Sequence, residues 1–138
     1  MGQVYYKLFY HLVWRTKLSQ PIITPRIEQV VVPFIENKAK RYGCYVHVVQ
    51  CVPDHIHVAM TIPPSLSVSD VVGKIKGSIS YFLNQELRIT TNFSWQDGFG
   101  VVSFGESDLP RIKTYILHQK EHHELGTLDP ELERHATP

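Results

Sequence analysis

Apolar and polar residues recur with two different spacings along the chain, and each spacing predicts one kind of element. Stretches rich in Val, Ile, Tyr and Phe with an apolar residue at every second position predict β-strands, at residues 3–14, 45–52, 55–62 and 101–104. Apolar residues three and four positions apart predict helices, at residues 26–42, from a cap at Ser67 through Leu83, and from a cap at Ser107 or Asp108 to about His123. The order β-α-β-β-α-β-α predicts an α+β fold, a ferredoxin-like antiparallel sheet with helices packed on one face.

Turn and breaker residues set the boundaries of these elements. Residues 53–54 are Pro-Asp, which is turn chemistry, so the two strands around them are expected to pair as a hairpin. Gly43 is a plausible end for the first helix. Pro33 lies inside that helix and is expected to kink it or to delay its start.

The length of 138 residues predicts one domain. We assign residues 1–125 to it and residues 126–138 to a polar, Pro-containing C-terminal tail that is expected to dock loosely. Hydrophobic residues make up 43% and charged residues 20% of the chain, which favours a packed core over disorder.

The net charge of +1 gives no overall basic excess, so a footprint for nucleic acid would have to be local. Cys44 and Cys51 form no disulfide pattern and are expected to be small buried residues in a reducing cytosol. No apolar run approaches the length of a membrane span, and the N-terminus does not resemble a signal peptide. We therefore expect a cytoplasmic protein with no membrane partner.

Two histidines stand one residue apart in the third predicted strand. Because side chains alternate along a strand, His55 and His57 share one face, while Ile56 and Val58 share the other. Their Cα atoms are then about 6.6–7 Å apart, close enough for two imidazoles to bind one metal ion. Two surface histidines on the wet face of a sheet would explain the spacing equally well.

The last predicted helix offers a tyrosine and a glutamine on one face, Tyr115 and Gln119, four residues apart. Tyr81 and Gln85 repeat the same spacing on the middle helix. The spacing alone therefore leaves open which pair, if either, accompanies the histidines.

Several motifs together resemble one known family in their order and approximate spacing. They are YHLVWRTK near the start, PDHIHV, KIKGSIS, WQDGFG and YILHQKEHH. Across residues 3–123 the chain resembles the single-tyrosine HUH transposases of the insertion-sequence 200-like group, which include the REP-associated tyrosine transposases. The resemblance implies the HUH endonuclease fold.

The resemblance also implies the chemistry. His55, His57 and Gln119 would bind a divalent ion, with Mg²⁺ or Mn²⁺ expected, and Tyr115 would be the nucleophile. Tyr81 matches no catalytic position of the family. The enzyme would cut single-stranded DNA at hairpin-bearing element ends through a 5′-phosphotyrosine intermediate and then join strands. It would act as a homodimer, and in many members each active site is shared between subunits.

Local basic and small residues are the candidate DNA contacts. They are Arg15, Lys17, Lys74, Lys76, Gly77, Ser78, Arg111 and Lys113. Trp95 and Phe99 could stack on bases. Each charge is also explained as a solvated surface residue, and each aromatic ring as a lid over the core.

Two other functions stay open at this point. One is a domesticated relative that binds hairpin DNA without transposition activity. The other is a zinc hydrolase, in which His118, His122 or His123 would add a third ligand to the histidine pair.

Overall fold

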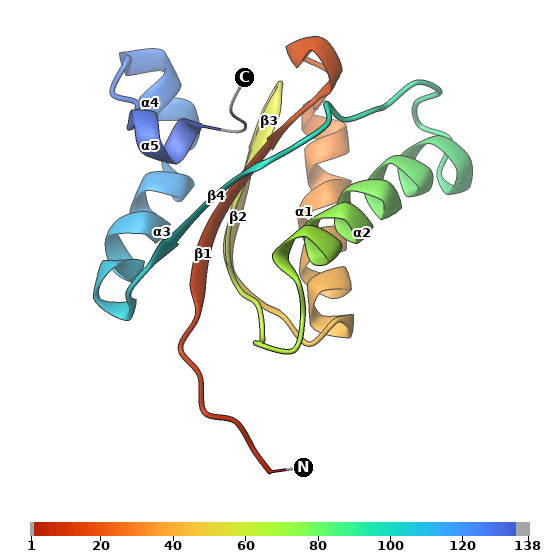
Figure 1. The fold of residues 1–138 in the computed structure, drawn as a ribbon. Coiled ribbons are helices and arrows are strands. Elements are labelled where there is room, and N and C mark those ends of the chain that lie inside the picture. The colour runs from red at the N-terminus through yellow and green to blue at the C-terminus, as the bar shows by residue number, and fades with distance from the viewer. Residues whose placement is uncertain (1, 135–138) are drawn as a thin grey trace.

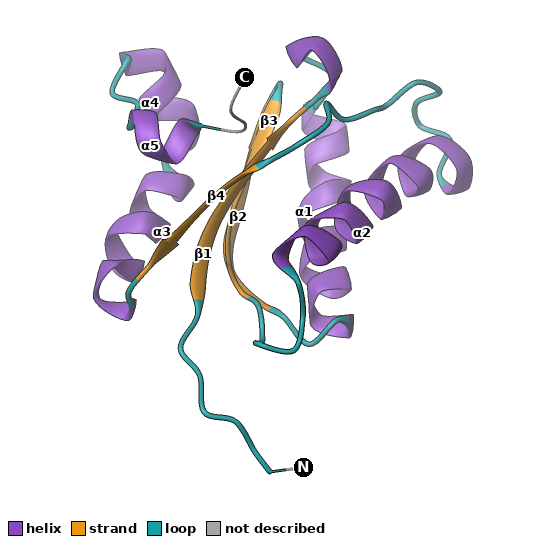
Figure 2. Cartoon of the chain, viewed as in Figure 1, coloured by secondary structure: helices purple, strands orange, loops and turns teal. Residues whose placement is uncertain are grey.

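The computed structural model describes residues 2–134, and its centre is one four-stranded antiparallel sheet with the strand order β2-β3-β1-β4 (Figures 1 and 2). The strands are β1 (Phe9–Arg15), β2 (Tyr45–Val52), β3 (His55–Thr61) and β4 (Gly100–Phe104). The helices are α1 (Pro25–Arg41), α2 (Val68–Tyr81), α3 (Leu109–Leu117), α4 (Gln119–Leu125) and α5 (Pro130–Glu133). None of these helices within residues 2–134 combines the length and apolar character that crossing a membrane requires.

The larger core lies between the sheet and the helices α1 and α2. Alternate residues of the two central strands point into it, Leu12 and Trp14 from β1 and Ile56, Val58 and Met60 from β3, and all five are fully buried. Cys44 and Cys51 are buried and unpaired, as predicted.

A smaller apolar cluster lies on the opposite face of the sheet, under the C-terminal helices. It consists of Val48, Ala59, Ile112, Ile116 and Leu132. The α+β class, the antiparallel sheet and the placement of α1 and α2 on one face agree with the prediction. The last predicted helix does not join them, because the sheet is apolar on both faces and α3 covers the second one (Figure 1).

The first strand is shorter than predicted. It begins at Phe9 rather than at residue 3, and Val4 and Tyr5 are 65% and 84% exposed. The pairing of β1 starts at Tyr10 with β3 and at Phe9 with β4. Alternation alone does not make a strand where no neighbouring strand supplies hydrogen bonds.

The first helix begins at Pro25 and continues through Pro33, which is exposed, so the expected late start does not occur. The hydroxyl oxygen of Thr24 accepts a hydrogen bond of 3.2 Å from the backbone N–H of Ile27 and caps the start. Gly43 has a φ of 79°, the left-handed conformation that ends helices, as predicted.

The last predicted helix is broken in two. His118 leaves the helical conformation at φ −101° and ψ 23°, so α3 ends before it and α4 begins after it. Its ring Nδ1 lies 2.8 Å from the carbonyl oxygen of Thr114. Tyr115 and Gln119 therefore stand on two consecutive helices rather than on one continuous face.

The described part of the tail is anchored rather than loose. The short helix α5 places Leu132, which is 4% exposed, in the smaller cluster against the sheet. The division between a domain at 1–125 and a tail at 126–138 stays a prediction, and residues 135–138 lie outside the described part.

Candidate metal and nucleophile site

The two histidines of β3 lie beneath the C-terminal helices and are fully buried. In the sheet register His57 pairs with Val13 and His55 with Arg15, and alternation turns both rings towards the layer of α3, α4 and α5. The alternative of two surface histidines on a wet face is therefore wrong, because the smaller apolar cluster brings the helices over this face.

Asp54, in the turn before β3, fixes the orientation of His55. The His55 Nδ1 and an Asp54 carboxylate oxygen are 2.6 Å apart. Because a carboxylate only accepts hydrogen bonds, Nδ1 must be the donor. In the neutral imidazole the lone pair then lies on Nε2, which faces the centre of the site, an arrangement common in metal-binding histidines.

His11 of β1 holds the second imidazole in the same way. Its Nε2 lies 2.8 Å from His57 Nδ1, and its side chain is 1% exposed. Burial, with the neighbouring His57, lowers the pKa of His11 to about 3, so the ring is neutral. Burial also lowers the pKa of His57. When His57 donates its Nδ1–H to His11, its Nε2 is free to bind a metal ion.

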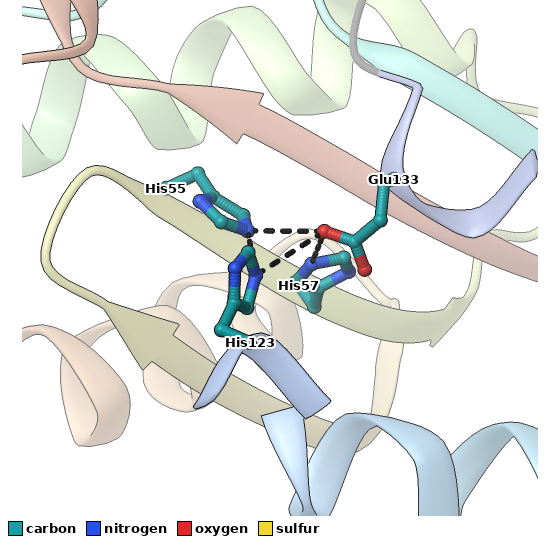
Figure 3. Close-up of side chains that lie close together, drawn as sticks. All are labelled: His55, His57, His123 and Glu133. Atoms are coloured by element: carbon teal, nitrogen blue, oxygen red, sulfur yellow. Dashed lines mark hydrogen bonds and ion pairs between the residues drawn. The ribbon is translucent and has the colours of Figure 1, made fainter. Parts of the chain in front are cut away.

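A carboxylate from the tail meets both rings. Glu133 Oε1 lies 3.3 Å from Nε2 of His55, 3.3 Å from Nε2 of His57 and 3.4 Å from Nε2 of His123, which is on α4. The two nitrogens of His55 and His123 are 3.2 Å apart. Figure 3 shows the four side chains converging from three separate segments, and their ligand atoms all lie within 4.8 Å of one another.

The other oxygen of Glu133 contacts the candidate nucleophile. Tyr115 Oη donates a hydrogen bond of 2.6 Å to Oε2 and accepts one of 2.9 Å from the backbone N–H of Asp129. Burial and the contact with Glu133 raise the pKa of Tyr115 well above its ordinary value, so the group is a neutral phenol. Burial opposes ionisation of Glu133, but the contacts with His55, His57 and Tyr115 outweigh it and lower the carboxyl pKa.

Gln119 completes the group from the start of α4. It is fully buried, and its Nε2 donates a hydrogen bond of 3.0 Å to Glu133 Oε2. Its Oε1 is buried and has no hydrogen-bond partner among residues 2–134. An unpaired buried oxygen on a side chain that contacts Glu133 fits a group that would bind a metal ion through that oxygen.

The other aromatic and histidine candidates lie outside the group around Glu133. His122 stacks on the Tyr115 ring with centroids 4.5 Å apart, and its Nδ1 lies 2.9 Å from the Thr127 hydroxyl. His118 is exposed. Tyr81 is 59% exposed on α2, across the sheet from the histidines. Of the three histidines considered as a third ligand, the structure brings His123 to the pair.

The predicted DNA contacts fall into separate regions. Arg15, at the end of β1, has its Nη1 3.4 Å from an oxygen of Asp54 and so lies next to the histidine pair. Lys17 follows it and is exposed. Arg111 and Lys113 are exposed on α3.

A second region lies on the far face of the sheet. Lys74, Gly77 and Ser78 line an open groove between α1 and α2. Lys76 is different, because its Nζ donates hydrogen bonds of 2.9 Å to each of the carbonyl oxygens of Gln96 and Gly98. Burial lowers the pKa of Lys76. That ammonium group anchors the loop before β4.

The aromatic candidates of the same loop pack inward. The Trp95 ring meets Trp14 edge-on at 6.2 Å, and its Nε1 donates to the Lys76 carbonyl oxygen. Phe99 packs against the larger core. Both positions suit a lid, and the roles in DNA binding of all these residues stay predictions.

Three partners of the site were not predicted from the sequence. Asp54 could have been found from the sequence, because it directly precedes His55. His11 had a weaker one, an additional histidine at an alternating position of the first strand. Glu133 had none, since it is separated from His57 by 76 residues and sits in an acidic tail.

Sequence comparison places the chain among known relatives. Residues 4–119 match the family described as IS200-like transposases. The transposase for insertion sequence element IS200 of Salmonella typhimurium is 26% identical over 122 residues, covering 85% of this chain and 80% of that protein. The ISDra2 transposase TnpA of Deinococcus radiodurans is 24% identical over 124 residues, covering 84% and 88%.

Two solved structures share the fold. A crystal structure from Deinococcus radiodurans R1, of a protein assigned as a transposase, superposes with a TM-score of 0.64 at 22% identity, covering 86% of this chain and 96% of that one. A REP-associated tyrosine transposase bound to a REP hairpin also superposes with a TM-score of 0.64, at 15% identity, covering 89% and 74%. The arrangement of the sheet and helices is thus one that a tyrosine transposase uses.

Proposed function

The chain belongs to the family of IS200-like transposases, and from this premise we propose that it cuts and rejoins single-stranded DNA through a covalent bond to Tyr115. The substrate we propose is a hairpin-bearing element end. Support for the hairpin comes from the fold shared with a REP-associated transposase bound to a REP hairpin.

The observation that carries this proposal is the meeting of four residues from distant parts of one chain. His55 and His57 from β3 and Gln119 from α4 surround the same carboxylate that holds the hydroxyl of Tyr115. A buried tyrosine is a poor nucleophile alone, because its pKa is raised. Its position beside three groups able to bind a metal ion supports a catalytic role.

In the proposed cleavage step, the Tyr115 oxygen attacks the scissile phosphorus in line. A bond between that oxygen and phosphorus forms, and the bond from phosphorus to the 3′ oxygen breaks. The phenol loses one proton and the departing 3′ oxygen takes one up, so the products are a 5′-phosphotyrosine and a free 3′-OH. A later attack by a 3′-OH reverses the step and joins strands without ATP.

The residues that would hold the ion in this reaction are His55, His57 and Gln119. Three neutral ligands leave the full charge of a divalent ion, Mg²⁺ or Mn²⁺ in our proposal, to stabilise phenolate and phosphate oxygens. The unpaired Gln119 Oε1 and the inward-facing lone pair of His55 support this assignment.

We propose a homodimer as the working state, with β4 as a candidate interface because it is an edge strand of the sheet. The cytoplasm remains the expected location. In this chain Tyr115 lies beside its own histidine pair, with ring centroids of Tyr115 and His57 6.3 Å apart. We therefore propose that each active site forms within one subunit.

A labelled single-stranded hairpin DNA, incubated with the protein and Mg²⁺ or Mn²⁺, tests the proposal. We expect a covalent protein–DNA adduct that survives denaturing electrophoresis and disappears with EDTA. Tyr115→Phe should abolish the adduct, whereas Tyr81→Phe should leave it unchanged because that side chain is exposed on the far face.

Each contrary result favours a particular alternative. DNA binding without an adduct, across a range of hairpin sequences, would favour a domesticated binding protein. Tight zinc binding with no DNA binding would favour a zinc hydrolase. An adduct that persists in Tyr115→Phe would assign the nucleophile to another residue.

A further inference from the structure

We propose that His123 and Glu133 join the histidine pair of β3 as ligands, giving the DNA-free protein a closed four-ligand site for a zinc-type ion. Three imidazole nitrogens and one carboxylate oxygen would form it. This site differs from the three-ligand site of His55, His57 and Gln119 proposed for catalysis. It rests on the proposed function only in placing an ion at the histidine pair.

The known distances between the ligand atoms are close to the edge length of a tetrahedral site. A tetrahedral ion with bonds of about 2.0–2.1 Å holds its ligands about 3.3–3.4 Å apart. Four of the six separations among these atoms are 3.2, 3.3, 3.3 and 3.4 Å, and all six are within 4.8 Å. Neighbouring ligands of an octahedral Mg²⁺ would be only about 2.9–3.0 Å apart.

The assignment of hydrogen-bond donors and acceptors also indicates a bound cation. His55 donates its Nδ1–H to Asp54, so its Nε2 carries a lone pair that faces Glu133 Oε1 at 3.3 Å. Two acceptors at that distance repel unless a cation lies between them. A second proton on His55 would relieve that one contact. His57 and His123 approach the same oxygen at 3.3 and 3.4 Å, so one cation placed among the four atoms would bind all of them.

Ligand type also separates zinc from magnesium. A ligand set of several nitrogens and one carboxylate suits Zn²⁺, whereas Mg²⁺ prefers oxygen ligands and retains several water molecules. The two strand histidines are fully buried and the Glu133 side chain is 11% exposed, while His123, 31% exposed, forms the solvent edge of the group.

The closed site would tie the tail to the nucleophile. Glu133 reaches the histidines through Oε1 and Tyr115 through Oε2. A DNA phosphate that approaches Tyr115 must therefore compete with this carboxylate. Occupation of the four-ligand site would keep the tail docked in the absence of DNA.

Zinc affinity measured on the full chain tests this inference. After removal of metals by chelator dialysis, we expect one Zn²⁺ to bind per chain in competition with a chromophoric chelator. Glu133→Gln and His123→Ala should each weaken the Kd by more than about 100-fold, since even partners behind the ligands contribute 10–100-fold. Millimolar Mg²⁺ should not displace the zinc. Co²⁺ in its place should give the intense visible absorption of tetrahedral cobalt, and both variants should lose it.

Glu131→Gln and Glu124→Gln are the matched controls, because both side chains are exposed, on α5 and α4, and neither belongs to the four-ligand group. Both should bind zinc as the wild type does. Unchanged zinc affinity in Glu133→Gln and His123→Ala, with circular dichroism showing that they fold, would overturn the inference. So would Mg²⁺ binding as tight as that of Zn²⁺.

The adduct assay with Mn²⁺ separates this inference from the proposed function. A covalent adduct together with wild-type zinc affinity in both variants would reject the four-ligand site and leave the transposase chemistry standing. Zinc binding that behaves as expected, without any adduct, would support the four-ligand site and reject the transposase chemistry.

Discussion

At the scale of single residues, the site depends on groups that orient the histidines as much as on the histidines themselves. Each ring of β3 has its Nδ1 occupied, by Asp54 for His55 and by His11 for His57. Both Nε2 atoms consequently face Glu133. Such partners select which nitrogen carries the proton, and a metal ligand works only when its free nitrogen faces the ion.

Replacing His11 tests this positioning role. In His11→Leu, His57 loses the acceptor for its Nδ1–H, and we expect metal affinity to fall about 10–100-fold. His11→Gln should restore most of the affinity, because an amide oxygen lies about as far from the backbone as Nε2. Chelator competition measures both variants.

A matched control comes from another strand. His47 lies 2.7 Å from the Thr61 hydroxyl and contacts none of the four ligand residues, so His47→Leu should leave metal affinity unchanged. Equal losses in His11→Leu and His11→Gln would mean that ring packing, rather than the hydrogen bond, is what His57 requires.

At the scale of elements, the interruption at His118 and the return of α5 decide the geometry. The break separates Tyr115 on α3 from Gln119 on α4, yet both reach the same carboxylate oxygen of Glu133. The helix α5 has only four residues and cannot be stable alone, so its position depends on tertiary contacts.

Leu132→Ala tests how α5 is held. Its side chain is 4% exposed in the cluster with Ile112 and Ile116. A buried Leu→Ala change removes about 2–5 kcal/mol of packing, and here we expect most of the loss in local opening of the tail. Amide hydrogen exchange of Glu133, whose N–H donates to Asp129, should accelerate, and zinc affinity should fall with it.

Leu128→Ala serves as the comparison, because Leu128 is in the same segment but 39% exposed. It should change neither quantity. Slow exchange of the tail amides in Leu132→Ala would show that another contact holds α5 in place.

At the scale of the whole molecule, the sheet separates two surfaces. One carries the candidate chemistry beneath α3, α4 and α5, and the other carries the groove between α1 and α2 that Lys74 lines (Figure 1). The residues proposed for cleavage all come from the first surface.

Mixing two inactive variants tests whether the site forms within one subunit. Tyr115→Phe keeps the histidines and His57→Ala keeps the tyrosine, so a site shared between subunits would be restored in mixed dimers. We expect no adduct from the mixture, because Tyr115 contacts its own site through Glu133. Recovery of adduct formation would show exchange of the tyrosine helix between subunits. Mixing each variant with the wild-type protein shows whether the variant inhibits an active subunit.

The sequence by itself determined the type and order of most elements and singled out the candidate site residues. The strand boundaries at 45–52 and the hairpin at 53–54 follow from local patterns, which depend on neighbouring residues alone. Alternation placed His55 and His57 on one side, and the family resemblance singled out Tyr115 and Gln119 as their companions. The structure brings these four together, while their roles stay predictions.

Only the tertiary structure decided what surrounds them. That both histidines are buried depends on α3 choosing the second face of the sheet, which no local pattern specifies. The contact between His57 and Glu133 joins residues 76 positions apart, and a lone carboxylate in an acidic tail has no periodicity to mark it. Local preferences fix elements, whereas the burial of apolar surface from distant segments fixes which side chains meet.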